Sequence, residues 1–87
     1  MGFRIVLSVE AKKDLDQLDL KIAKRIIKKL IWLNEQPDPR KLARILRQPA
    51  TGDLRFRVGD YRLIAILKIK EKMIIIVQIG HRSKVYL

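Results

Sequence analysis

The chain has 87 residues, of which 48% are hydrophobic, so we expect one domain with a modest core. Lysine and arginine number 20 against nine acidic residues, which gives a net charge of +11. The lack of cysteine excludes disulfides and thiolate metal sites, and a single histidine argues against a zinc or iron site built from this chain alone. A strong positive potential attracts polyanions, although charge alone does not separate RNA from DNA or from an acidic protein.

The sequence also predicts where the protein resides. The first residues contain no apolar run long enough for a signal peptide, and no segment is long enough to span a bilayer. We therefore expect a cytoplasmic protein that forms a single domain over residues 1–87. No membrane contact, cofactor or metal is expected.

The first part of the chain predicts a strand and two helices. Residues 3–9 are apolar and β-branched, which is typical of a strand. Ser8 can cap a helix that starts near Glu10, and Asp19 can cap a longer helix. This second helix should end at about Gln36, because the Pro-Asp-Pro sequence that follows disfavours helical geometry.

The second helix is predicted to be amphipathic. Its apolar stripe consists of Ile22, Ile26, Leu30 and Leu33, with lysines and an arginine on the opposite side. Trp32 projects into the basic side, where it could contact a partner, although packing against residues 37–53 is the favoured interpretation. The aspartates on or beside the first helix are expected to face solvent: Asp14, Asp16 and Asp19.

The remaining chain predicts a basic connection and three strands. Residues 37–53 form the connection, with one helical turn between about Arg40 and Leu46. Segments 54–58 and 61–69 alternate in hydropathy, and 73–79 is apolar on both faces, as a central strand should be. The order β-α-α-β-β-β predicts an α+β fold with two N-terminal helices on one face of a small, antiparallel-rich sheet.

A turn at Gly59-Asp60 would place Arg57 directly opposite Arg62. Like charges in that relation destabilise a sheet. By alternation, Arg55 shares their face, away from the helices. The three guanidiniums could splay harmlessly into solvent, but in so basic a chain we favour a site that binds phosphate. The face of Gln78 depends on the length of the loop near 70–72 and stays open.

The C-terminal sequence GHRSKVY adds residues that can transfer protons. His81, Arg82 and Tyr86 lie within six residues of one another and could return to the edge of the basic face. A base, cations around the phosphorus and an acid are what a metal-free ribonuclease needs. Tyr86 could equally be a packed aromatic residue, and His81 taken alone is more often an ordinary strand-end residue.

These motifs resemble the RelE/ParE toxin superfamily. The sequence RFRVGDYRLIA followed by IGHRSKVY, behind a first helix with EAKKDLDQL, is similar to its RelE branch over nearly the whole chain. The resemblance implies a RelE-like microbial RNase fold and a toxin that enters the ribosomal A site and cuts mRNA by 2′-hydroxyl attack without a metal.

The resemblance also implies roles for individual residues. Arg62 would stabilise the pentavalent phosphate, Arg82 would stabilise the transition state or protonate the leaving oxygen, and Tyr86 would be the general base. The basic pair on the preceding strand corresponds to Arg55 and Arg57, which act electrostatically because arginine does not give up its proton. The further residues assigned to phosphate or RNA binding are His81 and Lys84.

The partners implied are the ribosome, mRNA and a RelB-like antitoxin in a hetero-oligomeric complex. An apolar surface that includes Ile64 and Ile66 would suit an acidic antitoxin. Two alternatives remain: a ParE-like inhibitor that binds DNA gyrase without cleaving RNA, and a catalytically weak toxin that mainly binds its antitoxin.

Overall fold

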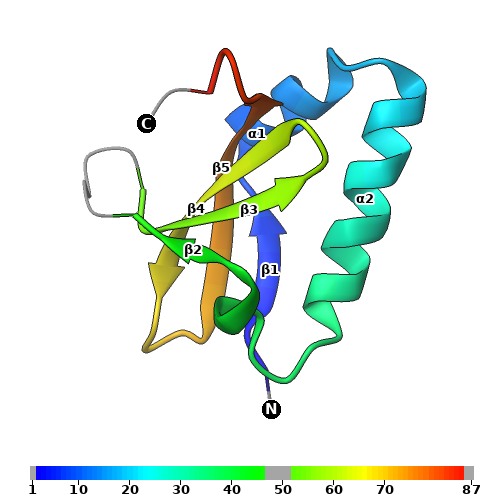
Figure 1. Cartoon of the computed structure of the whole chain (residues 1–87). Coiled ribbons are helices and arrows are strands. Elements are labelled where there is room, and N and C mark those ends of the chain that lie inside the picture. Colours follow the sequence, from blue (N-terminus) through cyan, green and yellow to red (C-terminus); the bar gives the residue numbers. More distant parts are fainter. Residues whose placement is uncertain (1, 47–51, 86–87) are drawn as a thin grey trace.

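The computed structural model describes residues 2–46 and 52–85. Two helices cover one face of a five-stranded sheet with the order β1-β5-β4-β3-β2 (Figure 1). β1 is parallel to β5, and the other neighbours are antiparallel. The α+β fold expected from the sequence is confirmed. The elements in chain order are β1 (Arg4–Leu7), α1 (Val9–Asp16), α2 (Leu20–Asn34), the 3-10 turn η1 (Pro39–Leu42), β2 (Arg44–Ile45), β3 (Leu54–Val58), β4 (Tyr61–Lys68) and β5 (Met73–His81).

The two helices begin where the sequence predicts. The Ser8 hydroxyl accepts a hydrogen bond from the Ala11 N–H at 3.1 Å, which satisfies one of the free amides at the start of α1. Asp19 occupies the N-cap position of α2, but its side chain makes no capping hydrogen bond. α2 ends at Asn34, slightly before the predicted end at Gln36. In the described part of the chain, no helix is long and apolar enough to cross a membrane.

The hydrophobic core lies between the helices and the covered face of the sheet. Phe56 and Leu63 are fully buried there against the apolar stripe of α2. The buried core residues are Ala11, Ile26, Leu30, Leu33, Leu54, Phe56, Leu63, Ala65, Ile74, Ile76 and Ile79. Because side chains alternate along a strand, the neighbours of these residues on β3 and β4 point to the open face.

The hairpin between β3 and β4 has the predicted register. Val58 pairs with Tyr61, and Arg57 pairs with Arg62. Gly59 adopts a φ of +59°, which a residue with a side chain rarely accepts. A Cβ at Gly59 would also lie 2.9 Å from a guanidinium nitrogen of Arg25, which reaches the turn from α2.

A β-bulge in β5 decides the face of Gln78. Ala65 pairs with Ile76, but Ile64 pairs with Gln78, so Val77 is the extra residue. The bulge lets both Ile76 and Ile79 enter the core and places Gln78 beside Ile64 on the open face.

The connection before β3 differs from the prediction. η1 supplies a short helical turn, in which Asp38 accepts hydrogen bonds from the Arg40 backbone and guanidinium at 2.8–3.2 Å. Arg44 and Ile45 then form β2, an edge strand that the sequence did not predict. A two-residue strand has no periodicity of its own, so only its pairing with β3 defines it.

The predicted exposure of Ile64 is wrong. Ile64 is completely buried outside the main core, whereas Ile66 is half-buried. The Cγ2 of Ile64 lies 2.6 Å from where a Cβ on Gly52 would stand, so the segment before β3 covers Ile64.

Asp14 differs from expectation, whereas Trp32 projects into the basic side of α2 as predicted. The Asp14 carboxylate does not simply face solvent, because it accepts a hydrogen bond from the Ile79 N–H at 3.0 Å. It thereby satisfies an amide of β5 beyond the end of β1. Trp32 remains 43% exposed, and the ammonium of Lys29 lies 4.7 Å from its ring centroid.

Candidate phosphate-binding site

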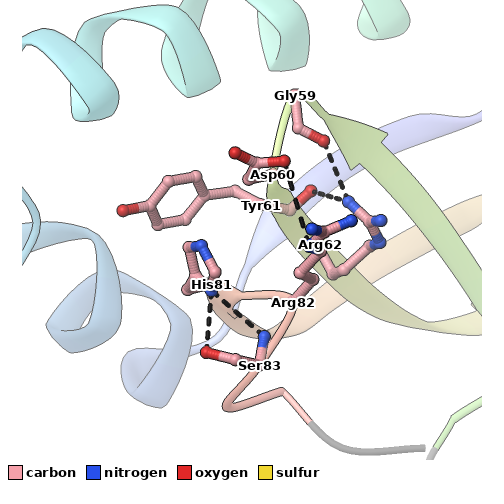
Figure 2. A network of polar contacts seen from close by, with 7 residues as sticks. All are labelled: Gly59, Asp60, Tyr61, Arg62, His81, Arg82 and Ser83. Carbon is pink, nitrogen blue, oxygen red and sulfur yellow. Dashed lines mark hydrogen bonds and ion pairs between the residues drawn. The ribbon is translucent and has the colours of Figure 1, made fainter.

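The open face of the sheet gathers arginines from four segments of the chain. β3 and β4 contribute Arg55, Arg57 and Arg62, as the register predicted. β2 adds Arg44, which pairs directly with Arg55 and makes a second like-charge pair. The residue after β5, Arg82, lies beside Arg62 (Figure 2). These residues (Arg44, Arg55, Arg57, Arg62 and Arg82) are called the arginine face below.

Part of the arginine face forms a groove of about 490 Å³. β2 and η1 form one side, and the open face of β3 and β4 forms the other. No acidic side chain lines the groove among the described residues. The lining residues are Lys41, Leu42, Ala43, Arg44, Arg55, Arg57 and Arg62.

Arg62 is the central cation of this face. Its Nη1 donates hydrogen bonds to the carbonyl oxygens of Gly59 at 3.0 Å and Tyr61 at 3.1 Å, which orient the guanidinium (Figure 2). Partial burial lowers the pKa of Arg62, and repulsion from Arg55, Arg57 and Arg82 lowers it further, against a smaller opposing effect of Asp60. Arginine stays protonated despite such a shift, so the repulsion persists until an anion binds.

Arg82 is held by the hairpin turn. Its backbone N–H donates to the carbonyl oxygen of Asp60 at 2.7 Å, and its Nε lies 4.0 Å from the Asp60 carboxylate (Figure 2). This backbone contact joins the end of β5 to the turn between β3 and β4. Consequently Arg62 and Arg82, which are distant in sequence, lie side by side.

The other predicted site residues lie elsewhere. His81 does not join the arginine face: it pairs with Tyr61, and their rings meet edge to face with centroids 5.4 Å apart. Both rings line a pocket of about 520 Å³ beside α1, together with Lys84. Tyr86, the predicted base, lies outside the described residues.

Sequence reasoning missed Arg44 and Lys41. The basic segment RKLAR was visible, but its residues join the groove only because β2 pairs with β3. Within residues 2–46 and 52–85, no three histidine, aspartate or glutamate side chains come together as metal ligands. The polar side chains that line the groove are all cationic, and guanidinium and ammonium groups suit phosphate oxygens.

The comparisons with known proteins identify the family. Residues 5–86 match the sequence model described as the ParE toxin of the type II toxin–antitoxin system parDE. The chain belongs to this toxin family. A comparison with curated protein sequences finds no match.

Solved structures with the same fold include toxins of the RelE group. The toxin–antitoxin complex RelBE2 from Mycobacterium tuberculosis has a TM-score of 0.80 at 22% identity, covering 94% of this chain and 100% of that chain. The archaeal RelE–RelB complex from Pyrococcus horikoshii has a TM-score of 0.72 at 29% identity, covering 97% and 99%. The free Escherichia coli toxin RelE, as a double mutant, has a TM-score of 0.62 at 20% identity, covering 99% and 92%. The resemblance to the RelE/ParE superfamily is confirmed, and the protein is a toxin of a type II toxin–antitoxin system.

Proposed function

We propose that this toxin is a ribosome-dependent mRNA endonuclease that cuts in the A site by 2′-hydroxyl attack. The arginine face supports the proposal most directly. Its like-charged pairs, Arg57 with Arg62 and Arg44 with Arg55, lower the stability of the free protein by electrostatic repulsion. A phosphate bound among these side chains would offset that repulsion by attraction to each guanidinium.

The chemistry divides among a base, cations and an acid. The ribose 2′-oxygen attacks the adjacent phosphorus while a base takes its proton, and the bond from phosphorus to the 5′-oxygen breaks as that oxygen is protonated. The RNA ends formed are a 2′,3′-cyclic phosphate and a 5′-hydroxyl. Arg62 would stabilise the added charge on phosphorus, and Arg82 would stabilise the negative charge that develops on the leaving oxygen, which takes its proton from water. By the family resemblance, Tyr86 is the proposed base.

The remaining cations of the groove would bind the RNA backbone. Arg55 and Arg57 offer fixed charges with paired donors, and arginine is a poor proton carrier, so their role is electrostatic. Lys84 and His81 line the pocket beside α1 and not the groove, so any contact they make would be with another part of the RNA.

A RelB-like antitoxin is the proposed cellular partner. Structures similar to this chain include RelB-bound complexes. The apolar side chains that such a partner could cover are Ile45 and Ile69, which are 76% and 61% exposed beside a groove of about 660 Å³. An acidic antitoxin would also offset the charge of +11.

Primer extension on a defined mRNA in a cell-free translation system tests the nuclease. We expect discrete cuts that need translating ribosomes and that weaken by about 100-fold or more in Arg62→Gln, as for loss of a transition-state donor. Lys68→Gln is the matched control, because Lys68 is an exposed cation on the same strand but pairs with Met73.

The family match also favours a second candidate, a ParE-like inhibitor of DNA gyrase. In that case mRNA stays intact in the presence of translating ribosomes, and the wild-type protein inhibits the supercoiling of DNA by gyrase. Intact mRNA together with undisturbed translation would refute the nuclease proposal.

A further inference from the structure

The turn that follows β5 is built around His81. The backbone carbonyl of His81 accepts hydrogen bonds from the Lys84 N–H at 2.8 Å and the Val85 N–H at 2.9 Å. The imidazole Nδ1 accepts a third backbone amide, the Ser83 N–H, at 3.1 Å and lies 2.8 Å from the Ser83 hydroxyl (Figure 2). The side chain and carbonyl of one residue thus satisfy the amides of Ser83, Lys84 and Val85.

These contacts select the tautomer of the neutral ring. A nitrogen that accepts a backbone N–H carries a lone pair, so Nδ1 has no proton and the neutral ring carries its proton on Nε2. The edge-to-face contact with Tyr61, at an interplanar angle of 88°, limits the ring's rotation from the other side.

The capped turn contains Arg82. Arg82 lies next to Arg62 against Coulomb repulsion, and its only described ion pair is a 4.0 Å contact with Asp60. Such an exposed, long contact contributes little. Backbone contacts must therefore hold Arg82 in place: its own N–H bonds the Asp60 carbonyl at 2.7 Å on one side, and the turn of residues 81–85 fixes the chain on the other.

The same turn returns the chain to the open face. Val85 is buried, and its Cγ2 lies 2.7 Å from where a Cβ on Gly80 would stand. Gly80 pairs with Arg62, so Val85 packs on the same face as the arginines. The turn thus anchors the chain on both sides of the sheet: the His81 ring lies on the α1 side and Val85 on the open face.

We propose that His81 is a positioning residue that caps the turn of residues 81–85 and thereby holds Arg82 on the arginine face. His81 does not touch the reacting phosphate. The proposal rests on the proposed function for the role of Arg82 toward RNA, but the cap itself is independent of that function.

Two substitutions separate a cap from a proton-transfer group. In His81→Asn, the amide oxygen can accept the N–H two residues later, as asparagine does in turns, whereas His81→Ala offers no acceptor. We expect Ala to lower ribosome-dependent cleavage by about five- to tenfold, the equivalent of one ordinary hydrogen bond, and Asn to stay within about twofold of wild type. Ser83→Ala keeps the backbone N–H of residue 83, so its cleavage activity should resemble that of His81→Asn.

Two cleavage results would overturn the proposal. Equal losses of about 100-fold in Asn and Ala would indicate that the imidazole transfers a proton. Full activity in Ala would show that the cap is not needed.

NMR tests the cap without any activity. His81 is the only histidine in the chain, so its ring nitrogens can be observed without overlap, and we expect the Nε2–H tautomer. The backbone amides of Arg82, Lys84 and Val85 should lose protection from hydrogen exchange in Ala and keep it in Asn. The Nδ1–H tautomer, or unchanged protection in Ala, would refute the cap. If wild type does not cleave mRNA but these NMR results hold, the proposed function fails and the cap stands.

Discussion

Repulsion between the guanidiniums of the arginine face should lower the free energy of unfolding of the free protein. Arg57 lies opposite Arg62 in the β3–β4 hairpin, and Arg82 lies beside Arg62. At about 6 Å, two like charges repel by about 0.7 kcal/mol even in water, and cross-strand pairs on sheets contribute about 0.2–1 kcal/mol. We therefore expect Arg57→Gln to raise the free energy of unfolding by about 0.5 kcal/mol, which is about 2–4 °C in Tm for a domain of this size.

Urea denaturation at two salt concentrations measures this effect. The Debye length falls from about 10 Å at 0.1 M salt to about 3 Å at 1 M, so the gain of Arg57→Gln should vanish in 1 M sodium chloride. Lys68→Gln controls for loss of charge alone and should change stability less, because no cation pairs with Lys68. A gain that persists at high salt, or a loss of stability in low salt, would refute the repulsion argument.

Two further predictions concern ligand binding and the sheet edge. Inorganic sulfate should raise the Tm of wild type by binding the arginine face, and a tenfold excess over its Kd would stabilise by about 1.4 kcal/mol. A double variant, Arg57→Gln with Arg62→Gln, should lose most of this response, and an equal response would place the anion elsewhere. Asp14→Ala should destabilise by about 1.5–3 kcal/mol, because the amide of Ile79 loses a charged acceptor, while Asp14→Asn keeps an oxygen and should lose less. Equal urea midpoints for Ala and Asn would show that this hydrogen bond contributes nothing.

The sequence by itself determined the local parts of the site. Gly59 and Asp60 define a two-residue turn, and strict alternation of apolar and basic residues leaves one register, so the Arg57–Arg62 pair follows from ten residues of sequence. The Ser8 cap of α1, the start of α2 after Asp19 and the amphipathic stripe of α2 are local in the same sense.

Tertiary structure alone decided which other residues complete the arginine face. Arg44 joins it through β2, a strand that exists only by pairing with β3. Arg82 reaches it through a backbone hydrogen bond to the hairpin turn, and His81, its neighbour in sequence, faces the opposite side because side chains alternate at the end of β5. The bulge at Val77 and the burial of Ile64 under Gly52 also depend on contacts between segments that are distant in sequence. The hydropathy pattern of a helix or strand depends on which of its faces is buried. The features above depend on contacts between two elements that are distant in sequence, so the pattern of either element alone does not predict them.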